Sequence, residues 1–375
     1  MAGTGANVIG GLAVAAGAVV VAGDLLDVVR ALVVPRPFVS GPVAAALRPL
    51  RAGYVAAGRR WRDRGRGDEV LAAGEPVLLL VRLALWLAIG VVGFALVIFG
   101  SGRLSFARSM VESGSSVFTL GFATGPGTVP AVVAFLGAAF GLVVVALQIA
   151  YLPALYDAFN RRETLVTMLE SRAGVPAWGP ELLSRHSLVG IHQNLPVLYD
   201  AWERWAADVA ESHTTYPALL RLRSPHPQNN WLVGLAAVLD SGALLLALSP
   251  TTAPAEARLC VRMGFTCLRD IARVLGLPFD PDPRPDEPIR LPYEDFAAAV
   301  AHMDAAGVPR ERSPEEAWPH FRGWRVNYET LTAALAAHLV VPPAPWLGLA
   351  GPAPLPARPE DRTPQQPSGG TARHP

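Results

Sequence analysis

The residues best suited to chemistry form a semi-polar, glycine-punctuated segment between two strongly apolar stretches of the chain. Backbone that is neither helix nor closed sheet can exist at membrane depth only where protein buries it or where it faces a water-filled cavity. A segment of this kind between two membrane spans therefore predicts the lining of a pore. The pore-lining candidates are Thr119, Ala123, Thr124, Gly125, Pro126, Gly127 and Thr128.

The apolar stretch that follows adds three candidates for a helix beside this pore. Gly137 and Gly141 have the small-xxx-small spacing that lets two helix backbones approach closely, or that supplies a hinge. Gln148 is the strongly polar side chain of the same stretch. A single glutamine in a span is typical of an interhelical hydrogen bond, and in an oligomeric pore it can also face the conduit.

Two stretches must position these residues, 77–99 and 129–152. Each is long and apolar enough to cross a hydrocarbon core of roughly 30 Å. The first contains one charge, Arg82, which lies close enough to an end for its side chain to reach the lipid headgroups. Both stretches are therefore predicted to be transmembrane helices.

A third apolar stretch, 8–23, continues to residue 34. Because no basic residue precedes it, an uncleaved span is favoured over a secretory signal. Asp24, Asp27 and Arg30 follow the apolar run, and we expect them near the membrane interface, where water can solvate them.

Arginine sets the expected orientation, because all 32 lysine-or-arginine positions of the chain are arginine. Nine of them lie between residues 24 and 76, two lie between the last two spans, and Arg161 and Arg162 follow at once. The positive-inside rule then puts the arginine-rich connection and the C-terminal half in the cytoplasm, and the N-terminus and the pore-like segment outside. Beside a span, such a cluster typically meets anionic lipid headgroups rather than nucleic acid.

Over about residues 24–162 the chain resembles the two-transmembrane pore module of potassium channels, the bacterial ion-channel family with one pore loop per chain. The resemblance implies a re-entrant pore helix, a homotetramer and passage of monovalent cations. It rests on Asp24-Leu-Leu-Asp27, Pro35, Pro76, a leucine-rich run with Trp86 and Gly93-Phe94, and Ser115-Ser-Val-Phe-Thr-Leu, which looks like the end of a pore helix.

In that family a Thr-Val-Gly-Tyr-Gly-Asp stretch from each of four chains presents rings of backbone carbonyls that replace the hydration shell of the ion. The resemblance aligns this stretch with the segment that begins at Ala123, and Gly125 and Gly127 keep the glycines that allow its unusual dihedral angles. The family's threonine is Ala123 here, its bracing aromatic is Pro126 and its aspartate is Thr128. These departures predict altered selectivity or a pore that no longer conducts. A plain extracellular hairpin is the alternative for the segment as a whole.

From residue 155 the pattern changes to helical periodicity interrupted by proline, without a useful run of β alternation, so an α-helical cytoplasmic domain is expected. The stretch 231–248 could be a fourth span, but Asp240 at its centre and its short length favour a buried core helix. The tail, 342–375, is rich in proline, glycine and serine and is predicted to be disordered. Expected helices cover 155–173, 180–188, 195–213, 216–222, 230–248, 254–275, 293–306 and 314–340.

No other constellation supports an enzyme or a metal site. Cys260 and Cys267 lie seven residues apart without a CxxC, which is typical of reduced core thiols. The histidines form no tight ligand pair, and no GxSxG, Walker loop or GxGxxG helix start occurs. Tyr199, Trp202 and Trp205 form an aromatic stripe typical of a core. The polar loop 224–230 has functional character, but a helix-to-helix turn that ends in an asparagine cap explains it as well.

Together these patterns predict an all-α membrane protein with three transmembrane helices, a re-entrant pore-like loop and a cytoplasmic helical domain. We expect a multi-pass plasma-membrane protein that is ion-channel-like, regulated by its cytoplasmic domain, and neither an enzyme nor dependent on a metal or cofactor. Its expected partners are membrane lipids, monovalent cations and copies of itself, not nucleic acid. A non-conducting, membrane-anchored helical scaffold or sensor is the alternative. The parts are an N-terminal span (1–34), an arginine-rich loop (35–76), a pore-like module (77–154), the helical domain (155–341) and the tail (342–375).

Overall fold

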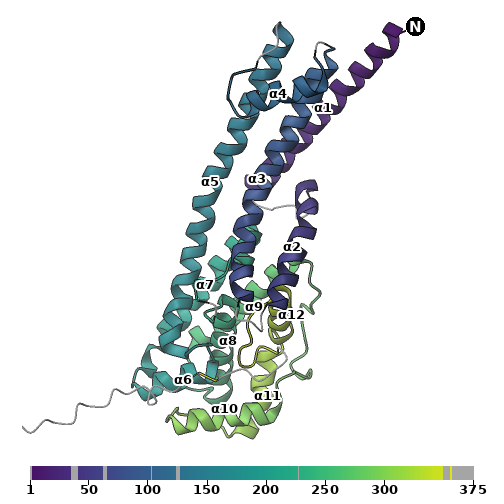
Figure 1. The fold of residues 1–375 in the computed structure, drawn as a ribbon. Coiled ribbons are helices and arrows are strands. Elements are labelled where there is room, and N and C mark those ends of the chain that lie inside the picture. Colours follow the sequence, from purple (N-terminus) through teal and green to yellow (C-terminus); the bar gives the residue numbers. More distant parts are fainter. Residues whose placement is uncertain are drawn as a thin grey trace, which may run out of the picture. The chain divides into compact units, whose positions relative to one another are not determined.

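The computed structural model describes residues 2–34, 41–61, 66–102, 104–123, 127–226, 228–348 and 355–356. In these ranges every regular element is a helix, which confirms the all-α prediction (Figure 1). The chain divides into two compact units. The first unit comprises Met1–Phe159 and Thr215–Leu222, and the second comprises Asn160–Thr214 and Arg223–Pro375.

The helices of the first unit are α1 (Ala2–Leu32), α2 (Pro42–Arg60), α3 (Gly67–Gly100), α4 (Phe106–Val117), the larger part of α5 (Thr128–Ala173) and the 3₁₀ helix η3 (Pro217–Arg221). The second unit contains the end of α5, α6 (Gly179–Leu188), η2 (His192–Asn194), α7 (Leu195–Thr215), α8 (Trp231–Leu248), α9 (Ala255–Leu275), α10 (Tyr293–Ala305), α11 (Pro314–Arg325) and α12 (Glu329–Leu339).

Four helical stretches among the described residues are long and apolar enough to cross a membrane: Val8–Leu32, Gly67–Gly100, Pro130–Ala173 and Trp231–Leu248. They make this a multi-pass membrane protein. Protein buries 22% of the residues in the most apolar window of the first stretch and 33% in those of the next two, but 100% in that of the fourth. The first three therefore present much of their apolar surface outward, whereas α8 is enclosed by protein.

The helices α1 and α3 pack with their backbones in contact, and glycine makes this approach possible. A Cβ on Gly17 would lie 2.5 Å from the carbonyl oxygen of Gly93, and one on Gly10 would lie 2.7 Å from that of Gly100. Since Gly10 pairs with Gly100 and Gly17 with Gly93, the two helices run antiparallel. Close contact between small residues is the usual way in which membrane helices associate.

The expectation of a loop over 35–76 is wrong for much of that range, which holds α2 and the first ten residues of α3. Pro42 favours a helix start at α2, and Asp68 and Glu69 in the first turn of α3 complement its positive N-terminal end. Arg51 on α2 pairs with Glu75 on α3 at 3.1 Å. Four arginines of this connection thus lie on α2: Arg48, Arg51, Arg59 and Arg60.

The span 129–152 and the expected helix 155–173 are one helix, because α5 continues through Pro153. Proline removes only one backbone donor from a helix, which a long and well-packed helix can tolerate. The expected helix 216–222 is the 3₁₀ helix η3, and it belongs to the first unit rather than to the second. There Leu219 and Leu222 form an apolar cluster with Leu79 and Tyr151.

In the second unit, a buried hydrogen-bond network connects α8 with α11 and α12. Asp240 of α8 accepts hydrogen bonds from Arg325 and Tyr328, and Arg325 also donates to Glu329 and to the carbonyl of Trp346. The helix expected over 314–340 is two helices, since α11 ends at Arg325 and α12 begins at Glu329. The break is stabilised because Glu329, at the start of α12, accepts the backbone N–H of Leu291 at 3.1 Å.

The first residues of the tail expected to be disordered are packed. Ala344 and Leu347 are buried, and the Trp346 ring lies 5.8 Å from that of Trp178 and 5.8 Å from that of Phe321. The burial of apolar residues in the stretch 344–347 outweighs the presence of Pro345. The rest of the tail prediction lies mostly outside the described residues.

Candidate functional site

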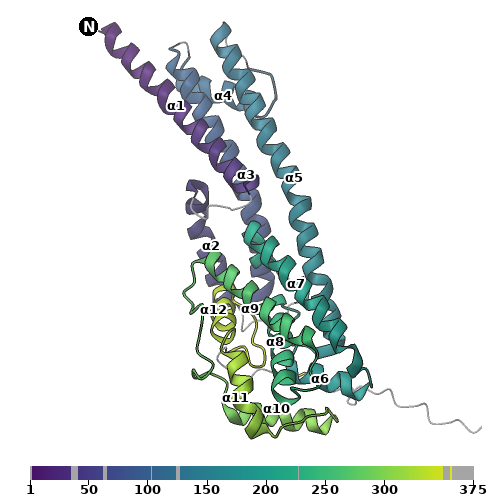
Figure 2. The same ribbon diagram turned by 180° about the vertical axis from the view of Figure 1, so that it is seen from behind.

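The short helix α4 is the element on which the pore prediction depends. It lies between α3 and α5 in both views (Figure 1; Figure 2). The Ser105 side chain caps its first turn by accepting the N–H of Arg108. At this end the Phe106 ring meets that of Phe99, near the C-terminal end of α3, at 5.9 Å. The spacing of Phe106, Met110, Val117 and Leu120 predicts a short helix over 105–120, and α4 confirms it apart from the last turn.

The buried face of α4 is polar. It consists of Ser109, Glu112, Ser113, Ser115 and Ser116, followed by Val117. Ser113 donates its hydroxyl to the carbonyl of Val91 on α3 at 2.7 Å, whereas Phe106 and Val111 are exposed. The exposed face also carries Arg108. A helix of a water-soluble protein usually buries its apolar residues, and α4 departs from this pattern at Phe106 and Val111.

The C-terminal end of α4 packs against α5 at the two glycines of the small-xxx-small pair. A Cβ on Gly141 would lie 1.9 Å from the carbonyl oxygen of Val117, and one on Gly137 would lie 3.4 Å from Cβ of Ser116. Because Gly141 has no side chain, the C-terminal end of α4 can lie directly against α5 at this position. Thirteen residues separate Gly141 from Thr128, the first residue of α5, which corresponds to about 20 Å along a helix axis.

After α4 the chain leaves helical geometry. Thr119 and Gly121 have positive φ angles of 57° and 71°, and Gly127 has a φ of 112°. The buried Ala123 donates its N–H to the Ser115 hydroxyl at 3.1 Å, which ties the returning segment to α4. The sequence placed Ser115 near the end of a pore-like helix but assigned it no contact, because one serine in a serine-rich helix gives no signal of this role.

The remaining predicted site residues are only partly brought together. Thr124, Gly125 and Pro126, at the centre of the filter-like stretch, lie outside the described residues. Thr128 is exposed at the start of α5. Gln148 is buried on α5, seven residues beyond Gly141. The structure thus places α4 beside Gly137 and Gly141.

Sequence reasoning missed a pair of buried carboxyl groups on α1. Asp24 is 4% exposed and Asp27 is 8% exposed, so the expectation that water solvates them is wrong. Asp27 accepts the indole N–H of Trp86 on α3 at 2.9 Å. The Arg82 guanidinium lies 5.8 Å from the centre of the Trp86 ring. The signal that could have revealed the pair is its spacing, since positions i and i+3 share one helix face.

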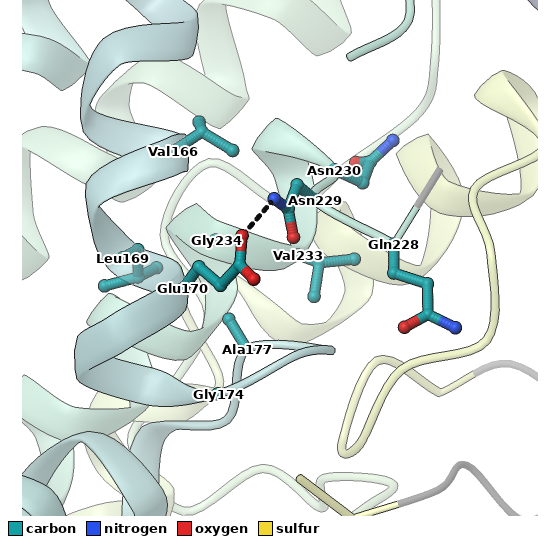
Figure 3. Close-up of a pocket in the computed structure, with 10 residues that line it drawn as sticks. All are labelled: Val166, Leu169, Glu170, Gly174, Ala177, Gln228, Asn229, Asn230, Val233 and Gly234. Atoms are coloured by element: carbon teal, nitrogen blue, oxygen red, sulfur yellow. Dashed lines mark hydrogen bonds between the residues drawn. The ribbon is translucent and has the colours of Figure 1, made fainter. Parts of the chain in front are cut away.

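A small pocket in the second unit includes residues of the polar loop 224–230 (Figure 3). Its polar edge is formed by Asn229, whose side chain donates to Glu170 at 3.0 Å. Its free volume is about 10 Å³, which is room for about one water molecule. Asn230 caps α8 by accepting the N–H of Leu232 at 2.9 Å, as the helix-turn interpretation predicted. This pocket is too small for an organic ligand.

The other features selected in the second unit are structural. Cys260 and Cys267 are free and buried, and burial raises the pKa of both thiols, so neither is poised to react. Tyr199, Trp202 and Trp205 are buried, as the aromatic stripe predicted. Among the described residues no group of three or more histidine, cysteine or acidic side chains could hold a metal ion.

Comparisons of the chain with protein-family models, with curated proteins and with solved structures found no match.

Proposed function

We propose that the chain is an ion-channel-like membrane protein in which α4 and the segment after it form a re-entrant loop. The observation that carries this proposal is the contact between the end of α4 and Gly141. Gly141 lies about 20 Å along the axis of α5 from Thr128, the residue at which that helix begins. In this proposal the chain enters between α3 and α5 with α4, and the described residues of the segment that follows, 118–123 and 127, are not helical.

The non-helical conformation of residues 118–123, which follow α4, supports a pore-lining role. Non-helical backbone at membrane depth needs protein or water around it. In a single copy, however, the large apolar side chains of Leu120 and Phe122 are 62% and 70% exposed. Neighbouring copies of the chain would cover them and would bring several returning segments around one axis. A homotetramer is the assembly that the filter-like sequence implies.

We further propose three transmembrane helices, with the N-terminus outside and the second unit in the cytoplasm of a plasma-membrane protein. The full burial of α8 and the pairing of its Asp240 with Arg325 support a core helix rather than a fourth span. An unpaired charge at the centre of a span would be costly. The arginines of α2 and of the residues around it favour the cytoplasmic side. Labelling of an introduced cysteine at position 65 tests this orientation, and labelling from outside would contradict it.

Current recording from the full chain in planar lipid bilayers tests the proposed conduction. Ser115→Ala removes the side chain that accepts the Ala123 N–H, and we expect a changed conductance. Ser116→Ala is the matched control, because its hydroxyl donates to the backbone carbonyl of Glu112 in its own helix, and we expect parental current. If folded protein passes no current, the alternative of a non-conducting membrane-anchored scaffold or sensor is supported instead.

Selectivity provides a second test. Because Ala123 and Pro126 replace the family's threonine and bracing aromatic, we expect the parent to discriminate only weakly between potassium and sodium. The triple variant Ala123→Thr, Thr124→Val, Pro126→Tyr should gain potassium preference, measured as a shift of the reversal potential under bi-ionic conditions. A strongly potassium-selective parent would contradict this assignment of the filter.

A further inference from the structure

The carboxyl pair on α1 lies within an apolar stretch that is long enough to span the membrane, Val8–Leu32. Ionisable side chains at such positions are rare, and they commonly mark pathways or relays for ions and protons. Here the two aspartates are three residues apart on a helix, which puts them on one face with about 5–6 Å between their Cβ atoms. Both are buried in protein.

The two carboxyl groups have different surroundings. Asp27 accepts the N–H of Trp86, and Gly41 at the start of α2 lies against it, where a side chain on Gly41 would collide with Oδ1 of Asp27. A hydrogen-bond donor and the positive end of a helix both stabilise an ionised carboxylate. Asp27 is therefore the member of the pair that can carry the negative charge.

Asp24 has no such support. Both of its carboxylate oxygens are buried, and neither has a hydrogen-bond partner among the described residues. An ionised carboxylate without partners is very costly to bury, and a second negative charge on the same helix face adds to that cost. The helices α1, α2 and α3 carry arginines that could have paired with Asp24, namely Arg30, Arg48 and Arg82. None of them is hydrogen-bonded to Asp24.

We propose that Asp24 and Asp27 form a proton-binding site within the α1 span, with the proton on Asp24 and the negative charge on Asp27. A proton fits better than a metal cation, because the pair offers only two carboxylates and one of them is engaged with Trp86. Magnesium and calcium require about six or more oxygen ligands. The site does not depend on whether the chain conducts ions.

Dicyclohexylcarbodiimide, which modifies protonated carboxyl groups in apolar surroundings, tests this proposal on the full chain in lipid nanodiscs, with the adduct located by mass spectrometry. We expect an adduct at Asp24 that decreases as pH rises and is absent from Asp24→Asn. We expect none at Asp27 in the parent. In Trp86→Phe, which removes the donor to Asp27, we expect the adduct to be shared between both positions.

Infrared spectroscopy provides the second measurement, for the case in which the reagent cannot reach the site. The carbonyl band of a protonated carboxylic acid should be present in the parent and in Ser113→Ala, which keeps the pair, and lost in Asp24→Asn. Absence of both the adduct and the band would overturn the proposal. Protection of Asp24 by sodium at constant pH would also overturn it, since the site would then hold a metal cation.

Discussion

Replacing Gly141 with alanine tests the packing of α4 against α5. The new Cβ would lie 1.9 Å from the carbonyl oxygen of Val117, whereas ordinary contact begins at 3.4 Å. The end of α4 would have to move by about 1.5 Å, because a backbone carbonyl cannot rotate away as a side chain can. Overpacking of this kind costs typically about 1–3 kcal/mol.

Gly137→Ala is the matched control, four residues away on the same helix. Its Cβ would meet Cβ of Ser116 at 3.4 Å, which is ordinary contact. Both variants gain the same helix propensity of roughly 1 kcal/mol, so this gain cancels in the comparison. We expect the free energy of unfolding of Gly141→Ala to be lower than that of Gly137→Ala by about 1–3 kcal/mol. Equilibrium unfolding of the two proteins in mixed micelles measures this difference, and equal stabilities would refute the close packing of α4 on α5.

Three further predictions concern single side chains, each measured by the free energy of unfolding of the full chain. Ser113→Ala should cost about 1 kcal/mol, because it removes the hydrogen bond to Val91, and an unchanged stability would contradict that bond. Arg325→Met leaves the buried Asp240 without its charged partner and should cost about 3–5 kcal/mol, whereas the control Arg204→Met removes an exposed pair and should cost under about 1 kcal/mol. Burial, together with the positive charge of Arg162, holds the pKa of His213 well below its ordinary value of 6.5. The unfolded chain then binds more protons, so His213 should lower stability as pH falls below about 6.5, and His213→Gln should weaken that dependence.

The sequence predicted elements whose pattern is local. Apolar length gave three of the four helical stretches that are long and apolar enough to cross a membrane, and proline and capping residues gave most helices of the second unit within a few residues. The spacing of apolar residues over 105–120 gave α4. Each of these signals comes from residues that are close together in the sequence, so periodicity, caps and prolines are enough to predict the helix.

The errors have a different origin. The break after Arg325 depends on contacts with Asp240 and Leu291, which are distant in sequence. The burial of Asp24 depends on how α1 packs against α3. The glycines at which these two helices meet do not reveal from the sequence that Asp24 will be buried. The role of Ser115 follows from its hydrogen bond with Ala123, which the sequence does not predict. Tertiary contacts between residues that are far apart in the sequence determine these features. A single sequence does not reveal which of its residues will form such contacts.

Single-particle imaging of the full chain in lipid nanodiscs tests the central proposal most directly. We expect four copies arranged around one axis, with α4 of each copy pointing into the assembly and residues 119–128 of all copies facing that axis. A monomer would contradict the proposal, as would an assembly in which residues 119–128 face lipid.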